Sequence, residues 1–64
     1  MNVKALRKKY LKGTRVTLVE MDDVQAPPVG TQGTVTFVDD MGNIHIRWDN
    51  GSSLAVIYGT DIIK

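Results

Sequence analysis

The most constraining feature of this 64-residue chain is the pattern of residues 27–54, PPVGTQGTVTFVDDMGNIHIRWDNGSSL. It contains a Pro-Gly approach, a strand, a glycine turn, a second strand that ends in tryptophan, an Asn-Gly turn and a third strand. Short strands separated by such tight turns are typical of a small, strongly bent antiparallel barrel. The pattern therefore predicts a fold class and leaves the activity open.

We predict five short strands, of which the first four have inward apolar residues at alternate positions and the last is a pair of isoleucines. These strands fall at residues 14–20, 33–38, 43–48, 53–57 and 62–63. Residues 21–30 form a long loop after the first strand, and residues 58–61 form a tight turn before the last. This arrangement predicts a mainly β fold, a five-stranded SH3-like barrel. An OB-type barrel is the rival, but it carries a helix between its third and fourth strands, for which the chain leaves no room.

The strand side chains that the alternation places on the inner face form the expected core. It consists of Val16, Leu18, Val35, Phe37, Ile44, Ile46, Trp48, Leu54, Val56 and Ile62. Residues 43–48 show the phase most clearly, because Ile44, Ile46 and Trp48 share one face and His45 and Arg47 share the other. We expect Gly42 to accept a positive φ in the turn before this strand.

The first twelve residues predict a separate element, a short basic helix preceding a barrel over residues 13–64. Asn2 can cap a helix over residues 2–11, and Gly13 can end it. Val3, Leu6 and Tyr10 fall on one face of this helix, and lysines spaced by four line the other. Ten residues are too few for a stable helix alone in water, so it either packs through its apolar face or frays until something binds it.

Charge is distributed unevenly along the chain. The first fifteen residues hold six basic side chains and no acidic one, whereas residues 16–64 hold two basic side chains and all seven acids. A split of +6 against −5 predicts an anionic partner, or docking of the helix on its own barrel. The chain has no cysteine, no export signal and no apolar run that could cross a membrane, which predicts a cytoplasmic protein.

The residue types that perform chemistry are sparse, so we predict a protein that is not an enzyme and has no cofactor or metal. The single histidine, His45, is expected to face solvent on a strand, and one histidine without a thiol does not make an ordinary zinc site. Asp39, Asp40 and Asn43 surround a glycine turn and lack the alternating ligands of a calcium loop. GTQGTV leads into a strand and carries no lysine, unlike a phosphate-binding loop.

Two binding hypotheses remain. The first is a protein or peptide partner held by the long loop and the adjacent barrel face, since SH3-type sites place aromatics beside such a loop. Its candidate residues are Met21, Asp22, Gln25, Arg47, Trp48 and Tyr58. Within this set Trp48 has an alternative role, because its phase also places it in the core. The second hypothesis is a nucleic acid bound through the helix, with Lys4, Arg7, Lys8 and Lys12 as the contacts. The oligomeric state stays open.

Six motifs carry a resemblance to a known family. They are GTRV at 13–16, MDD at 21–23, QAPP at 25–28, GTQGTV at 30–35, IRWDNGSSL at 46–54 and the tight turn at 58–61. Over these residues the chain closely resembles a small bacterial family known only as a domain of unknown function, with Ile46 where that family has valine. The resemblance implies the fold, and a stand-alone or mobile-element-associated bacterial protein, but no activity.

A second resemblance is shorter and rests on a GTV strand followed by a strand ending in WDNG. It is to the substrate-recognition domain of the mind bomb ubiquitin ligases, which is SH3-like and binds peptides. Because a shared fold does not imply a shared function, this likeness adds only slightly to the peptide hypothesis.

Overall fold

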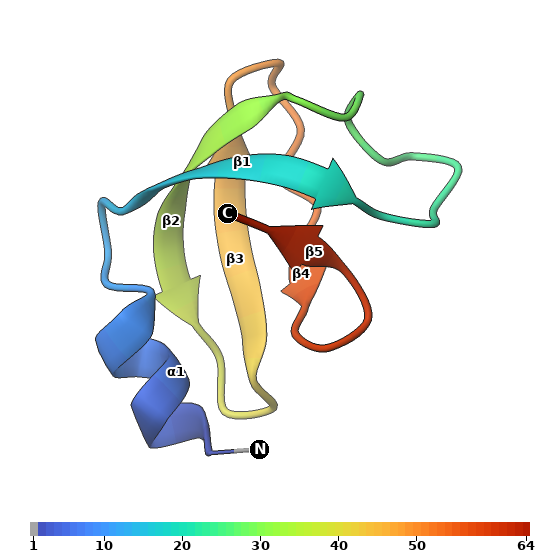
Figure 1. The fold of residues 1–64 in the computed structure, drawn as a ribbon. Helices are drawn as coiled ribbons and strands as arrows, with labels where there is room; N and C mark the ends of the chain where they lie inside the picture. The colour runs from blue at the N-terminus through green and yellow to red at the C-terminus, as the bar shows by residue number, and fades with distance from the viewer. Residues whose placement is uncertain (1) are drawn as a thin grey trace.

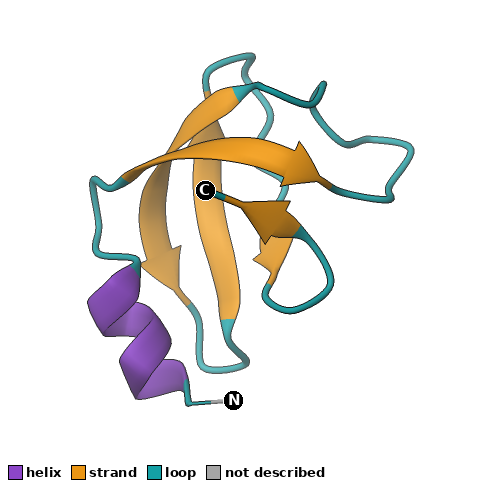
Figure 2. Cartoon of the chain, in the orientation of Figure 1, coloured by secondary structure: helices purple, strands orange, loops and turns teal. Residues whose placement is uncertain are grey.

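The computed structural model describes residues 2–64, which form one short helix followed by five antiparallel strands in an open sheet (Figures 1 and 2). The sheet order is β4-β3-β2-β1-β5, so the first strand pairs with both the second and the last. The elements are α1 (Val3–Lys9), β1 (Arg15–Glu20), β2 (Gln32–Val38), β3 (Asn43–Trp48), β4 (Val56–Ile57) and β5 (Ile62–Ile63). The predicted helix and five strands are all present, with different bounds at several ends.

The helix is docked on the sheet. Asn2 caps it as expected, because its side-chain oxygen accepts hydrogen bonds from the backbone amides of Lys4 and Ala5 at 2.9 and 3.3 Å. Leu6 is buried among the strand residues, and Arg7 Nε donates to the carbonyl of Val38 at 3.1 Å. The chain therefore takes the first of the two predicted options, packing through the apolar face.

Both hairpin turns of the central strands use the same three-residue loop. In the first, the amide of Gly42 donates to the carbonyl of Asp39, and in the second the amide of Gly51 donates to the carbonyl of Trp48, both at 3.0 Å. Gly42 and Gly51 have φ values of 85° and 94°, and Asn50 does not have a positive φ. The Asn-Gly signal thus predicts the turn correctly, but glycine alone takes the left-handed position that this loop length requires.

The fourth strand is shorter than the predicted residues 53–57 and keeps only its last two. The Trp48 indole explains this difference, because its Nε1 donates to the carbonyl of Leu54 at 2.9 Å. The Ser52 hydroxyl oxygen also accepts a hydrogen bond from the Leu54 amide. Leu54 is therefore held by side chains, and regular pairing with β3 begins only at Val56, opposite Ile44.

Most of the predicted core is buried, with two corrections. Phe37 was expected inside but is 54% exposed, and Ile62 is 48% exposed. A bulge between Val35 and Phe37 adds one residue to β2, which turns Phe37 outward and buries Val38 in its place. A similar irregularity between β1 and β5 leaves Ile63, rather than Ile62, packed against the core. Leu54 is half-buried, and Leu6 of the helix joins the core without having been predicted there.

Gly33 allows the two central strands to approach closely. A Cβ at this position would lie 2.5 Å from Ile46 Cγ2 and 2.8 Å from Trp48 Cε3. Its φ is ordinary, so the position requires a small residue because of packing and not because of the backbone conformation. Gly33 therefore fixes how tightly the Trp48 ring is enclosed.

Candidate functional site

A groove lies between the start of the long loop and the turn that joins β4 to β5, with a volume of about 320 Å³. Its apolar lining includes Met21, Leu54 and Ile57, and Asp22, Asp23 and Asp61 supply three carboxylates. The remaining lining residues are Asn43, Ala55 and Thr60. We call this the acidic groove. Its residues come from four separate segments of the chain, and the fold alone brings them together.

Hydrogen bonds shape both walls of the acidic groove. On the loop side, Asp23 accepts the amide of Gln25 through its side chain at 2.8 Å and the amide of Ala26 through its carbonyl at 3.0 Å. On the opposite side, Asp61 Oδ2 accepts the amide of Ile57 at 2.8 Å, which closes the β4–β5 turn. Asp23 and Asp61 are thus structural as well as charged. Asp22 is exposed and makes no side-chain hydrogen bond within residues 2–64, so its charge can be changed without breaking the loop.

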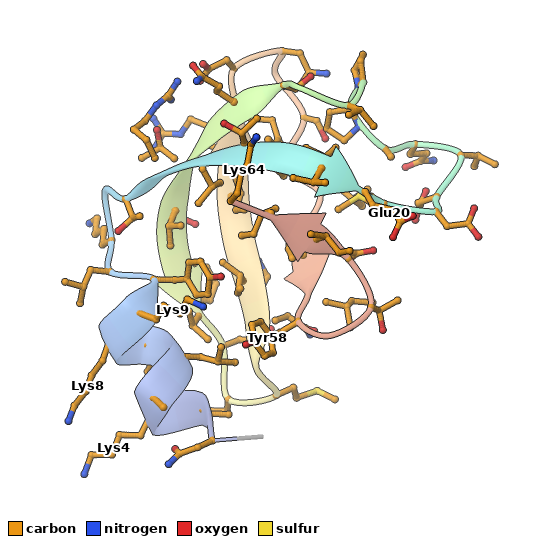
Figure 3. The ribbon with its side chains drawn as sticks, in the orientation of Figure 1. Lys4, Lys8, Lys9, Glu20, Tyr58 and Lys64 are labelled. Carbon is orange, nitrogen blue, oxygen red and sulfur yellow. The ribbon has the colours of Figure 1, made fainter. Side chains whose placement is uncertain are left out.

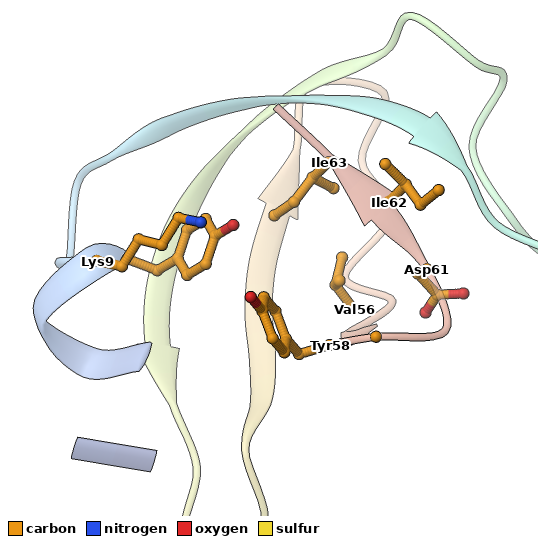
Figure 4. A pocket seen from close by; sticks show the side chains of 8 residues that line it. Lys9, Val56, Tyr58, Asp61, Ile62 and Ile63 are labelled. Atoms are coloured by element: carbon orange, nitrogen blue, oxygen red, sulfur yellow. The ribbon is translucent and has the colours of Figure 1, made fainter. Parts of the chain in front are cut away.

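A second hollow, of about 310 Å³, separates the helix from the β4–β5 turn (Figure 4). Tyr58 from the turn and Lys9 from the helix flank it, and Ile62 and Ile63 of β5 form another wall. The rings of Tyr58 and Tyr10 meet edge to face with centroids 6.5 Å apart. Tyr58 therefore serves the contact between helix and turn, although 42% of its surface is still exposed.

The outer face of β2 and β3 carries a stack of side chains that the sequence did not predict. The Phe37 and His45 rings lie parallel with centroids 4.2 Å apart, and His45 Nε2 is 2.9 Å from Asp39 Oδ2. The hydrogen bond from His45 lowers the pKa of Asp39 to about 2, aided by the backbone amides of Asn43 and Met41. This is the one hydrogen bond of the His45 ring within residues 2–64, so the ring is oriented by a carboxylate and does not contact a hydroxyl.

Two of the basic side chains in the first fifteen residues, Arg7 and Arg15, are held by aspartates of the sheet region. Arg7 pairs with Asp40 at 2.6 Å, and Arg15 contacts both oxygens of Asp49 at 2.8 and 2.6 Å. These hydrogen bonds raise the pKa of Arg15 and lower the pKa of Asp49. By contrast, Lys4, Lys8 and Lys12 are exposed and form no ion pair with any acid of residues 2–64. Figure 3 shows Lys4 and Lys8 pointing away from the sheet.

The predicted partner-binding residues do not form one site. Met21 and Asp22 line the acidic groove, whereas Gln25 lines a neighbouring hollow beside His45 and Ser53. Arg47 is exposed next to Phe37, and Tyr58 faces the helix. The structure places Trp48 in the core with 1% of its surface exposed, which agrees with the alternative role given to it above.

Sequence reasoning missed the other side of the acidic groove. Leu54 was expected in the core, and Ile57, Thr60 and Asp61 had no predicted role beyond their strand or turn. One signal was present: Asp61 ends a tight turn, where an aspartate often accepts a nearby backbone amide. Nothing local indicates that this turn faces the loop at residues 21–23.

Residues 2–64 contain neither a membrane-spanning helix nor a cluster of three metal-ligating side chains. No helix in this part of the chain is long and apolar enough to cross a membrane. Among the same residues, no three side chains of the histidine, cysteine, aspartate or glutamate type lie close enough together to hold a metal ion.

Helix, sheet and groove together define a small, mainly β protein with a short N-terminal helix. The chain belongs to the family described as Domain of unknown function (DUF4314), whose model matches residues 1–64. This confirms the family resemblance drawn from the motifs. No curated protein and no solved structure shows significant similarity to the chain.

Proposed function

We propose that the protein is a non-catalytic interaction module that binds an extended segment of a protein partner in the acidic groove. The observation that carries the proposal is the composition of that groove: an apolar lining with Met21, Leu54 and Ile57 beside three carboxylates. Such a surface suits a segment that presents an apolar side chain next to lysine or arginine. An extended peptide provides this arrangement because its alternate side chains point to opposite sides.

An SH3-like barrel is the finer fold assignment that we propose for the sheet. It is supported by the order β4-β3-β2-β1-β5, by the long loop after β1 and by the tight turn before β5. The long loop supplies Met21, Asp22 and Asp23 to the groove, and the tight turn supplies Thr60 and Asp61. Because one fold serves many functions, the residues of the groove and not the fold indicate the kind of partner.

The two kinds of contact in the groove contribute differently. Exposed ion pairs provide about 0.2–1 kcal/mol each and are screened by salt. Apolar contacts with Met21 and Leu54 persist at high salt, because they depend on the area removed from water. We therefore expect binding that weakens with salt without disappearing.

The test is selection of peptides from a random displayed library on the full chain, followed by affinity measurements on the enriched peptides by fluorescence anisotropy. We expect enrichment of lysine or arginine beside an apolar residue, and binding at least about tenfold weaker in Asp22→Lys. The matched pair Asp22→Asn and Asp40→Asn separates the groove from net charge, because Asp40 is paired with Arg7 and does not line the groove. Equal binding by wild type and Asp22→Lys would contradict the proposal.

A second candidate function is nucleic-acid binding through the helix, favoured by Lys4, Lys8 and Lys12, which are exposed and form no ion pair within residues 2–64. Each lysine that meets a phosphate adds to an affinity that is independent of sequence and falls with salt. Arg7 would contribute less than expected from the sequence, because it is held by Asp40 and Val38. A gel shift at low salt that is lost in Lys8→Glu with Lys12→Glu supports this function. Absence of any shift by wild type removes it.

A further inference from the structure

The C-terminal end of the helix carries an exposed apolar residue among lysines. Leu11 follows the helix and is 62% exposed, with Lys12 beside it and Lys8 one turn earlier. Most of this leucine is therefore accessible to a partner. Its surroundings are the reverse of the acidic groove, where apolar side chains are accompanied by carboxylates.

The helix cannot reach the groove of its own molecule. Leu6 is fixed in the core, Arg7 is bound to Val38 and Asp40, and Tyr10 packs against Tyr58. These contacts hold the helix against β2 and the β4–β5 turn, on the other side of that turn from the start of the loop that follows β1 (Figure 1). Filling its own groove would require the helix to leave the sheet.

We propose that the acidic groove binds the basic end of the helix from a second copy of this chain, with Leu11 entering among Met21, Leu54 and Ile57. Lys8 and Lys12 then approach the carboxylates of the groove. This inference rests on the proposed function of the groove and names its occupant. It is supported by complementarity of both charge and apolar surface, each present on every copy.

The contact joins two different surfaces, so each copy offers one of each to its neighbours. Its charged part lies on the surface and is therefore sensitive to salt, because the screening length falls to about 10 Å at 0.1 M. A contact this small is weak and transient, and its association depends on protein concentration.

The test is sedimentation velocity of the full chain over a range of concentrations, at low and at high salt. We expect association at low salt that high salt reduces. Lys8→Glu with Lys12→Glu should abolish it, and so should Asp22→Lys, each alone. Mixing these two variants should restore one contact between them, because the first keeps an unchanged groove and the second keeps an unchanged helix end. Leu11→Ser, which keeps every charge, should weaken association at least about tenfold.

Circular dichroism confirms that each variant is folded before it is compared. A wild type that stays monomeric at every concentration overturns this inference, and so does a mixture that fails to associate when wild type does. Peptide binding in the groove measured on the same samples separates the two proposals. If selected peptides bind and lose affinity in Asp22→Lys while the chain stays monomeric, the groove function stands and the self-contact fails. If neither occurs, both fail.

Discussion

Two parts of the molecule contrast in how they are held together. The strands β1, β2 and β3 have six or seven residues each and enclose most of the core, including Trp48 and Ile44. The strands β4 and β5 have two residues each, and this part of the chain exposes Ile57 of β4, Tyr58 of the turn and Ile62 of β5. We call the first part the scaffold and the second the edge.

The contrast separates stability from binding. In the scaffold, close packing leaves little freedom for substitution, because interiors are packed as densely as crystals. At the edge, the short strands and the turn expose apolar and acidic side chains that a fold alone does not need, and these form one wall of the acidic groove. Scaffold substitutions should therefore change the free energy of unfolding, and groove substitutions should change binding.

The largest expected effect is from Trp48→Ala. The ring is 1% exposed, and its removal leaves a cavity and an unpaired Leu54 carbonyl. The cost is about 3–5 kcal/mol, comparable with the whole stability expected of a domain this small. Loss of the thermal unfolding transition checks this. Tyr58→Ala at the edge should lose the pair with Tyr10, about 0.5–1.5 kcal/mol, together with the burial of a ring that is already 42% exposed, a smaller loss than that of Trp48. Equal losses of stability in the two variants would contradict the contrast between scaffold and edge.

A smaller effect is expected from Gly33→Ala. The added methyl group meets Ile46 and Trp48 at 2.5 and 2.8 Å, and neither buried side chain can move away freely. Overpacking of this kind costs about 1–3 kcal/mol, measured by urea unfolding. The exposed control Ser53→Ala should stay within about 0.5 kcal/mol of wild type. A neutral Gly33→Ala would show that the scaffold is looser than described.

Asp39, in the turn between β2 and β3, should make the free energy of unfolding depend on pH in the acid range. The pKa of Asp39 is about 2 in the folded chain against an ordinary 3.8, so its charged form favours folding. That contribution is complete above pH 4 or so and is lost as the pH falls through about 2. The free energy of unfolding, measured with urea at a series of pH values, should fall less steeply in acid for Asp39→Asn than for wild type. The Asp49 carboxylate, whose pKa is also lowered, accounts for part of the remaining decline. Parallel profiles would contradict this role of Asp39.

The smallest expected change in stability is from Asp22→Asn. This carboxylate makes no hydrogen bond within residues 2–64, so the free energy of unfolding should stay within about 0.5 kcal/mol of wild type. Binding of a selected basic peptide should nevertheless weaken, as anisotropy will show. A variant that loses stability and binding together would indicate that the groove belongs to the scaffold.

The scaffold was largely predictable because its signals are local. The alternation of Ile44, Ile46 and Trp48 is the side-chain period of a strand, and the glycines of both hairpin loops mark turns. The bulge that exposes Phe37 was not predictable, since no residue near Thr36 distinguishes an inserted residue from continued alternation.

The candidate site was predictable only in part, because it depends on contacts between distant segments. Met21 and Asp22 were found from the long loop beside a strand. Leu54 reaches the groove because the Trp48 indole holds its carbonyl, a contact that the pattern of strands does not reveal. Asp61 lies opposite the loop only because β5 pairs with β1.

Amide chemical-shift mapping of the full chain with an enriched basic peptide tests the central claim most directly. We expect the largest chemical-shift changes at residues 21–23 and 54–61, on both walls of the acidic groove, and little change at the buried amides of β2 and β3. Largest changes around Phe37 and Arg47, or none anywhere at saturating peptide, would contradict it.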